Sequence, residues 1–402
     1  MERAIAPLAF VLAGMLLPLA ALAAPGDAPP SGGKDSAAPG EAPTPARTEG
    51  SRFVDPEDGQ LDLSDFLAAP RTFLPIPIVV TEPAVGYGGG IAAMFLRPRT
   101  EAGHEGWVRP NISMAAGFAT ENGTRGAFAG DSSRWIDARL RSLAGAGGGR
   151  VNLDFYGLGP GGASPDQKVR YSLRFGGALA QANWQLAPRS PWSAGLRYAY
   201  ADVQPELRDA PAFPGLADRV HVKISAPTPI LEYDSRDNIF TPTHGVYAES
   251  SLMASRAALG ASADFERFDQ ILMGWTPLAR GATLGARLDY SWSSDGTPFF
   301  LRPYVALRGV AAVRYQGDQV ASTELELRVP VEGRWSAVVF GGAGRTWTRR
   351  DELSATRGVG SGGAGLRYEL ARKFGMHAGI DIARSAGTTA VYLQVGSAWF
   401  RP

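Results

Sequence analysis

Apolar and polar residues alternate one by one along most of the chain. In residues 283–292, Leu284, Leu288 and Trp292 fall on one side of an extended backbone. Arg287 and Asp289 fall on the other side. A period of two predicts β-strands with one apolar face and one polar face. The same pattern recurs in residues 169–175, 192–200, 322–331, 364–370 and 379–383.

Three features of these segments favour a membrane barrel over a soluble β-sandwich, which also alternates. The segments are longer than the average of about five or six residues for soluble strands. Their apolar faces end in aromatic residues such as Trp192 and Tyr200, which suit a membrane interface. Their polar faces carry full charges of both signs, which a water-filled lumen tolerates and a dry core does not. Because a bilayer leaves no strand edge unpaired, we expect the strands to close on themselves.

The predicted fold is therefore all-β. It is a transmembrane antiparallel β-barrel that covers residues 72–402 and follows a short N-terminal helix and linker. About 330 residues, at about 20 for each strand with its turn, give 16 strands, with 14 or 12 as the alternatives. Such a barrel is expected in the outer membrane of a Gram-negative cell, in contact with outer-membrane lipid and lipopolysaccharide.

The residues before the barrel divide into three segments. Residues 1–23 have a basic start, an apolar run and an A-x-A cleavage motif, which predicts a secretory signal peptide. Residues 24–50 contain mostly Ala, Pro, Gly and Ser, a composition typical of a disordered linker. Apolar residues in 51–71 predict a short helix that begins near Asp62 or Ser64. This last segment is expected to plug the lumen or to lie in the periplasm.

Composition excludes several classes of function. The chain has 402 residues, no cysteine and a net charge of +1. The lack of cysteine excludes a lipoprotein anchor, a disulfide framework and a thiolate metal site. The near-zero charge argues against a nucleic-acid partner. The histidines have no metal-ligand spacing, the G-x-G-x-x-G of residues 360–365 has no βαβ unit around it, and no G-x-S-x-G elbow occurs. We therefore expect no cofactor, no metal and no catalytic residue, and the protein is predicted not to be an enzyme.

Two motifs, taken in order along the chain, indicate a family. The first is a hairpin with the sequence Asp-Ser-Arg-Asp-Asn at residues 234–238, and the second is a long loop ahead of residues 322–331. In this combination the chain resembles the BamA/TamA superfamily (the bacterial surface antigen family) of outer-membrane assembly and translocation barrels. The hairpin residues that match are Asp234, Arg236, Asp237, Asn238, Pro242 and Gly245.

The resemblance covers roughly residues 71–402 and implies a function. It implies a non-enzymatic insertion or translocation factor, in which a weak seam between the first and last strands opens laterally for an exported client protein. An arginine-glycine-aromatic motif of the long loop folds into the lumen in this family and contacts an acidic residue of the wall. We favour such a contact for Arg314, and the protein is expected as a monomer or homodimer. The loop candidates are Arg308, Gly309, Arg314, Tyr315 and Gly317.

The chain departs from the family pattern in two respects. Residues 340–344 read Phe-Gly-Gly-Ala-Gly, so the usual acidic partner of the loop arginine is missing. Glu324, Glu326 or Asp381 could replace it. The family's periplasmic POTRA domains have no room between Ala24 and the barrel, because a domain needs at least about 50 residues. The resemblance is therefore to a member that lacks POTRA domains.

The charges on the predicted lumen faces leave a second function open. We favour a hydrated ladder of cross-strand ion pairs, and the alternative is the selectivity lining of a passive pore for small polar solutes. A third function, lipid hydrolysis, would need a lipid-facing serine and histidine pair that no spacing suggests. The lumen charges are Arg287, Asp289, Glu324, Glu326, Arg328, Arg367, Glu369 and Asp381, together with Arg170, Arg174 and Arg197.

Overall fold

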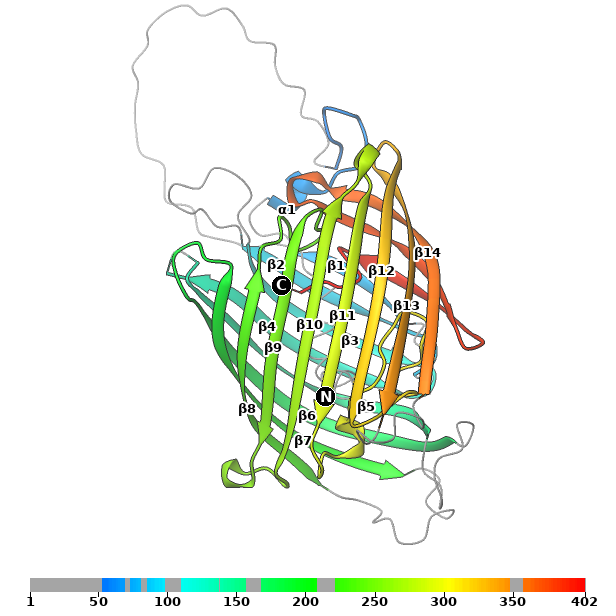
Figure 1. Cartoon of the computed structure of the whole chain (residues 1–402). Coiled ribbons are helices and arrows are strands. Elements are labelled where there is room, and N and C mark those ends of the chain that lie inside the picture. The colour runs from blue at the N-terminus through cyan, green and yellow to red at the C-terminus, as the bar shows by residue number, and fades with distance from the viewer. Residues whose placement is uncertain are drawn as a thin grey trace, which may run out of the picture.

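The computed structural model describes residues 53–68, 73–80, 85–97, 110–136, 138–156, 168–207, 221–347 and 357–401. Sixteen strands form one antiparallel sheet that curves into a barrel, and sequence neighbours are always paired (Figure 1). This confirms the predicted fold class and strand number. The predicted signal peptide and linker lie outside the described residues.

The elements follow one another with few helical turns between them. The short helices are α1 (Ser64–Ala68), η2 (Ala257–Leu259), η3 (Ala279–Gly281), η4 (Phe299–Leu301) and η6 (Arg372–Phe374). No helix in the described part of the chain is long and apolar enough to cross a membrane. The strands are β1 (Leu74–Val80), β2 (Gly88–Arg97), β3 (Asn111–Thr120), β4 (Arg125–Trp135), β5 (Leu140–Tyr156), β6 (Lys168–Gln185), β7 (Trp192–Leu207), β8 (Val222–Asp234), β9 (Gly245–Ser255), β10 (Phe265–Pro277), β11 (Thr283–Ser293), β12 (Gln319–Glu332), β13 (Trp335–Trp347), β14 (Arg357–Ala371), β15 (Met376–Ser385) and β16 (Thr388–Val395).

The barrel has two different ends. The terminal end, at the top of Figure 1, carries α1, the β12–β13 turn and the β14–β15 turn. The long-loop end, at the bottom, is where residues 294–318 connect β11 to β12. We call residues 294–318 the long loop.

The two faces of the wall have the chemistry that alternation predicts. Leu288, Leu325 and Leu366 on the outer face are 50%, 52% and 55% exposed, while Asp289 and Glu324 on the inner face are buried. An apolar outer face of this kind meets lipid, and the charged inner face encloses the lumen. Large aromatic residues are also exposed on the outer face, namely Trp135, Trp184, Trp192, Tyr198, Tyr200 and Trp335.

One strand reverses the predicted faces. In β6, Tyr171 and Leu173 are almost fully buried, and Tyr171 packs edge to face on Phe299 of the long loop at 5.3 Å between ring centroids. These apolar residues therefore face the lumen. Arg170 and Arg174 have the opposite parity and face outward, so the prediction that they line the lumen is wrong. The reason is that the long loop fills the lumen at this height with apolar side chains.

Candidate functional site

The long loop turns into the barrel and packs against its wall. Phe300, Leu301, Val305 and Val313 of the loop are each 1% exposed or less. Two glycines of β13 provide the space: a Cβ at Gly344 would lie 2.3 Å from Val305 Cγ1, and one at Gly342 would lie 2.9 Å from Leu307 Cδ2. The Gly-Gly-Ala-Gly sequence of β13 is thus explained by close approach of the loop.

Arg308 anchors the loop to three carboxylates of the wall. Its Nη2 donates to Glu324 Oε1 at 2.7 Å and lies 2.8 Å from Glu326 Oε2. Its Nη1 donates to Asp381 Oδ2 at 2.9 Å. The guanidinium also stacks on the Phe340 ring, 3.5 Å from the centroid. An arginine fork suits this arrangement because it offers several donors in fixed directions to different acceptors.

The backbone beside this arginine is also fixed. Gly309 has φ of +85°, and its N–H donates to Tyr392 Oη on β16 at 2.9 Å. A Cβ at Gly309 would lie 3.1 Å from the backbone nitrogen of Arg384 on β15. Both the positive φ and the tight contact favour glycine here. The loop therefore contacts the last two strands through its arginine and its glycine together.

Two further groups complete the charged cluster. Arg367 on β14 donates to both oxygens of Asp381, at 2.6 and 2.8 Å. Trp399 lies beyond the end of β16, in a tail that turns into the lumen, and its Nε1 donates to Glu324 Oε1 at 2.7 Å. We call Arg308, Glu324, Glu326, Arg367, Asp381 and Trp399 the lumen cluster. Because its buried charges are ion-paired and, except for Glu326, hydrogen-bonded to one another, removing one member leaves the others buried without their partner.

The Asp-Ser-Arg-Asp-Asn hairpin joins β8 to β9 at the terminal end. Arg236 donates to both oxygens of Asp234 at 2.8 Å and lies over the ring of Tyr247 at 4.5 Å. Asp237 accepts hydrogen bonds from the N–H and hydroxyl groups of Thr243, which closes the turn. The hairpin is therefore shaped by its own side chains.

The hairpin also reaches across the barrel mouth to the last strands. Asn238 Nδ2 donates to the carbonyl of Phe374 at 2.8 Å, in the turn between β14 and β15. Phe240 stacks on Phe400 with 5.5 Å between centroids. The carbonyl of Pro242 accepts from Arg328 of β12 at 3.1 Å. These contacts tie the β8–β9 hairpin to the β14–β15 turn, to the C-terminal tail and to β12.

Gly245 should tolerate no side chain. Its φ is +103°, and a Cβ there would lie 2.4 Å from the carbonyl oxygen of Ser235. We expect Gly245→Ala to destabilise the barrel by about 3 kcal/mol, from backbone strain and overpacking together. Gly260→Ala is the matched control, since its φ is +90° but nothing lies within 4 Å of its Cβ. Urea unfolding in detergent, followed by tryptophan fluorescence, measures both; equal losses would mean that the contact with Ser235 is unimportant.

The first and last strands meet without joining. β1 pairs with β2, and β16 pairs with β15, but no ladder joins β1 to β16 among the described residues. These two strands have 7 and 8 residues, whereas β5 and β6 have 17 and 18. The seam between β1 and β16 is thus a place where, among the described residues, no ladder closes the wall.

Comparison with solved structures identifies this architecture. The barrel is similar to BamA from Haemophilus ducreyi lacking POTRA domains 1–3, with a TM-score of 0.53 and 13% identity over 81% of this chain and 69% of that one. It is similar to CdiB from Acinetobacter baumannii, with a TM-score of 0.54 and 11% identity over 80% of this chain and 59% of that one. For CdiB from Escherichia coli the TM-score is 0.57, with 11% identity over 82% and 63% of the two chains. No protein-family model and no curated protein matches the sequence.

The chain has the BamA–CdiB barrel fold. It is an outer-membrane barrel, as its lipid-facing surface requires. Among the predicted loop residues, Arg308 and Gly309 make the wall contacts described above, so the contact that was favoured for Arg314 is made by Arg308 instead. Arg314 lies over the ring of Tyr315, 5.8 Å from its centroid, and Gly317 donates its N–H to the carbonyl of Pro303 at 3.1 Å. The structure thus brings Arg308 to Glu324, Glu326 and Asp381, the three acids considered as substitutes.

Apart from Arg170 and Arg174, which face outward, the other predicted lumen charges lie on the inner face but outside the lumen cluster. Arg287 pairs with Asp289 of the same strand at 2.9 Å. Glu369, near the terminal end, lies 3.7 Å from Arg372. In a second inner network only Arg197 was predicted: Tyr247 donates to Glu249 at 2.7 Å, and Arg197 lies 3.7 Å from Glu249. No group of three or more metal-ligating side chains suited to a metal ion occurs among the described residues.

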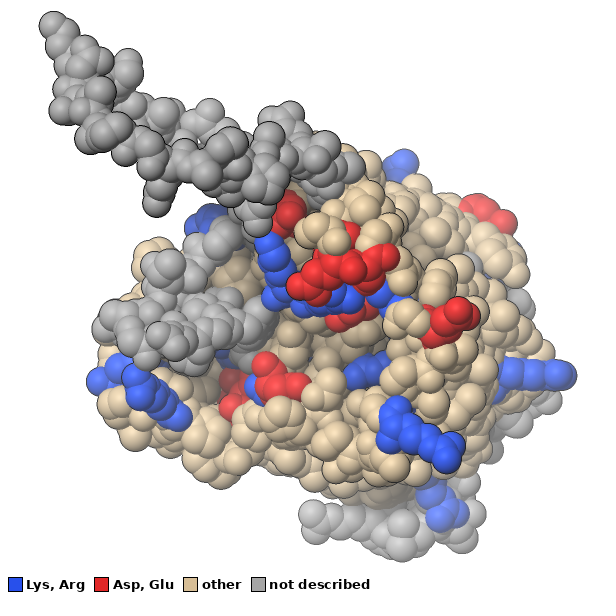
Figure 2. Space-filling view, turned by 90° about the horizontal axis from the view of Figure 1, so that it is seen from above, with Lys and Arg blue, Asp and Glu red and all other residues tan. Residues whose placement is uncertain are grey.

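The N-terminal segment docks on the rim of the terminal end. Arg334, in the β12–β13 turn, is surrounded by Asp55, Asp58 and Asp62, at 2.5, 2.8 and 2.5 Å. Arg372 adds an ion pair to Asp55 at 3.0 Å. Figure 2 shows acidic and basic atoms gathered together on this end. Residues 53–68 therefore lie on the turns between strands, held by ion pairs and by the buried side chain of Leu67.

We expect this docking to depend on pH and on Arg334. A hydrogen bond from Arg334 lowers the pKa of Asp58; burial would raise the pKa of Asp62, but hydrogen bonds from Ser64 and Arg334 lower it. A carboxyl whose pKa is lowered on docking stabilises the docked state above its ordinary pKa, and this stabilisation is lost as the pH falls through the lowered value. The protection factors of residues 53–68 in hydrogen exchange, which correct for the pH dependence of intrinsic exchange, should therefore stay high at pH 7 and 5 and fall below about pH 4.

Two substitutions separate the contributions to this docking. Arg334→Ala should remove most of the exchange protection of residues 53–68 at pH 7, because the Arg334 side chain is 1% exposed and contacts three carboxylates. Arg372→Ala should have a small effect, because its side chain is 40% exposed and exposed ion pairs contribute little. Equal protection in wild type and Arg334→Ala would contradict the charge-based docking.

Proposed function

We propose that this barrel inserts or translocates exported proteins at the outer membrane, without enzymatic chemistry, through the seam between β1 and β16. The observation that carries the proposal is the lack of a ladder between these two strands among the described residues. A client strand needs unpaired backbone to pair with, and an open strand edge supplies it. Likeness in fold to BamA and CdiB, and the family hairpin motif, support the same function.

Two prolines explain why the seam stays weak. Pro75 and Pro77 lie two residues apart in β1, so their missing N–H donors fall on the same side of the strand. Prolines in sheets are found where the missing donor faces away from the ladder. Since β1 pairs with β2 over all seven residues, we infer that the prolines face β16. A full ladder across the seam would then lack two donors.

The long loop and the seam are connected through β16. Tyr392 on β16 accepts the hydrogen bond of Gly309, and Trp399 beyond β16 shares Glu324 with Arg308. Movement of β16 away from β1 would therefore disturb the anchor of the loop. We infer that the lumen cluster holds the closed state, and that the opening of the seam is coupled to release of the loop.

The lumen charges allow the alternative, a passive pore for small polar solutes. Apolar packing of the loop against β6 and β13 favours a closed barrel instead, since Phe299 lies on Tyr171 and Val305 on Gly344. A pore would give steady conductance in planar bilayers, and that conductance would change with Arg287→Glu or Glu326→Arg. An insertion factor with a filled lumen would conduct little at rest.

Reconstitution tests the proposed function directly. The purified barrel is placed in liposomes, and the folding of a small urea-unfolded β-barrel added from outside is followed by its heat-resistant gel mobility. We expect folding at least about tenfold faster than in empty liposomes, which corresponds to about 1.4 kcal/mol on the barrier. Liposomes that contain an unrelated porin are the control. Equal rates with this barrel and with the porin would exclude an insertion function.

A further inference from the structure

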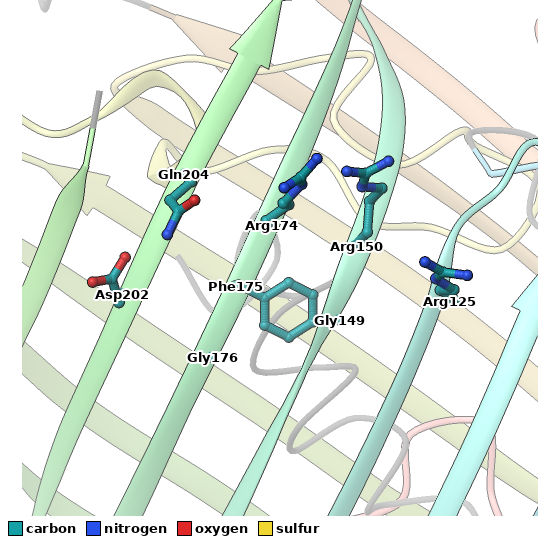
Figure 3. Close-up of a pocket in the computed structure, with 8 residues that line it drawn as sticks. All are labelled: Arg125, Gly149, Arg150, Arg174, Phe175, Gly176, Asp202 and Gln204. Carbon is teal, nitrogen blue, oxygen red and sulfur yellow. The ribbon is translucent and has the colours of Figure 1, made fainter. Parts of the chain in front are cut away.

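Three arginines form a row across adjacent strands near the long-loop end (Figure 3). Arg125 on β4 lies directly opposite Arg150 on β5, and Arg150 lies directly opposite Arg174 on β6. Gln204 on β7 continues the row. We call Arg125, Arg150 and Arg174 the arginine row.

The arginine row is on the outside of the barrel. On β5, Arg141 reaches across the lumen to Glu232 of β8, so the odd-numbered residues of β5 face inward and Arg150 faces outward. On β6, Gln181 accepts a hydrogen bond from the inward Arg197, so Arg174 also faces outward. Arg125 shares the face of Arg150 because the two residues are directly opposite each other.

The row lies where the apolar outer surface ends. Along β7 the outward residues run from Trp192 through Leu196 to Tyr200, and the polar residues Asp202 and Gln204 follow. From Trp192 to Gln204 the strand rises about 30 Å, at about 3.4 Å per residue and a tilt of about 40°. A barrel's apolar band is about 25 Å tall. The arginine row therefore lies at the level of the lipid headgroups on the long-loop side.

Three like charges in one row are unfavourable unless an anion offsets them. Like charges directly opposite each other destabilise a sheet. Glu206 is the nearest acid, with Arg174 at 3.5 Å and Arg150 at 4.0 Å. In the described part of the chain no acidic group pairs with Arg125. The nearby Asp202 contacts His221 at 3.4 Å instead. The row thus keeps excess positive charge at a surface that faces lipid headgroups.

We propose that the arginine row binds the phosphate groups of a lipopolysaccharide molecule. Arginine forks match phosphate oxygens in pairs. Strands lie about 4.8 Å apart, so Arg125 and Arg174 are separated by about 10 Å and the row can engage more than one phosphate. A hollow of about 600 Å³ at the row is lined in part by Gly149 and Gly176, which add no bulk. The apolar outer surface that begins at Tyr200, on the side of the row toward the terminal end, is continuous with the acyl-chain region. This binding is independent of the proposed insertion function.

Lipid binding by purified protein tests the proposal. Full-length barrel in detergent is titrated with bisphosphorylated lipid A, and the bound lipid is counted by native mass spectrometry. The variant is Arg125→Gln, Arg150→Gln and Arg174→Gln together. The control, with the same change in net charge, replaces the exposed Arg97, Arg189 and Arg280 of the terminal end by glutamine. We expect binding to weaken at least about tenfold in the row variant, equivalent to about 1.4 kcal/mol, and to stay unchanged in the control.

Further probes identify the source of the phosphate. Dephosphorylated lipid A and phosphatidylglycerol should bind much more weakly, and inorganic phosphate should not compete. Without lipid A, the row variant should unfold at the same temperature as the wild type or higher, since repulsion is removed. With lipid A, only the wild type and the control should gain stability. Unchanged binding by the row variant would overturn the proposal. Competition by inorganic phosphate, or equal binding of phosphatidylglycerol, would overturn the assignment to lipopolysaccharide.

Discussion

Replacing Arg308 by alanine is expected to destabilise the barrel by about 3–5 kcal/mol and to free the long loop from the lumen. The Arg308 side chain is 8% exposed and interacts with Glu324, Glu326 and Asp381. Its removal leaves three buried carboxylates with Arg367 as their main remaining partner. Breaking one side of a buried ion cluster costs far more than the pair contributes, because the remaining charges stay desolvated.

Unfolding in urea and protease cleavage within residues 294–318 measure this effect. Arg314→Ala is the matched control, because Arg314 lies in the same loop but stacks on Tyr315. We expect it to cost less than Arg308→Ala, since Arg314 is half-buried and a cation–π contact contributes about 0.5–2 kcal/mol. Arg308→Lys should give an intermediate result, since lysine keeps the charge but loses the fork. If Arg314→Ala cost as much as Arg308→Ala, the lumen cluster would not be the anchor of the loop.

A disulfide across the seam is expected to slow client folding at least about tenfold, about 1.4 kcal/mol on the barrier. The substitutions are Ile76→Cys on β1 and Gln394→Cys on β16, both at buried positions near the terminal end. The natural sequence has no cysteine, so no other disulfide can form. The oxidised barrel cannot separate the two strands, and reduction should restore activity. The liposome assay described above gives the rate.

A second disulfide tests whether a crosslink that leaves the seam free also slows client folding. Ala383→Cys and Ala390→Cys lie directly opposite each other on β15 and β16, within an existing ladder. This disulfide leaves the seam free to open, so client folding should continue at the wild-type rate. Full activity of the oxidised Ile76 and Gln394 pair would show that clients do not need the seam, and the proposed route would have to be abandoned.

Much of the fold could be predicted because a barrel wall faces lipid on its outer side and water on its inner side. Alternation places Leu288 in lipid and Asp289 in the lumen, and the same rule applies strand after strand. The sequence left two candidates for the loop arginine that contacts the wall, Arg308 and Arg314, because one precedes a glycine and the other an aromatic residue. Only the fold, which brings Glu324 and Asp381 to one place, distinguishes Arg308.

Other features could not be read from local pattern. The faces of β6 depend on Phe299, which is more than a hundred residues away in sequence and makes the lumen apolar beside Tyr171. Trp399 lies beyond the last strand and reaches Glu324 because the chain turns inward after Val395. Arg334 gave no signal, because its three acidic partners come from the opposite end of the sequence. These features therefore depend on contacts between residues far apart in the sequence, which the alternation of apolar and polar residues does not reveal.

The unequal strand lengths have a consequence for the surrounding bilayer. The 8 residues of β16 rise only about 20 Å along the membrane normal, at about 3.4 Å per residue and a tilt of about 40°. On the same basis, the 18 residues of β6 rise about 45 Å. The hydrocarbon layer is about 25–30 Å thick, so β6 is long enough to span it and β16 is too short. We expect lipids beside β1 and β16 to be compressed where they meet the wall, and this hydrophobic mismatch would lower the resistance to the lateral entry of a polypeptide that we propose.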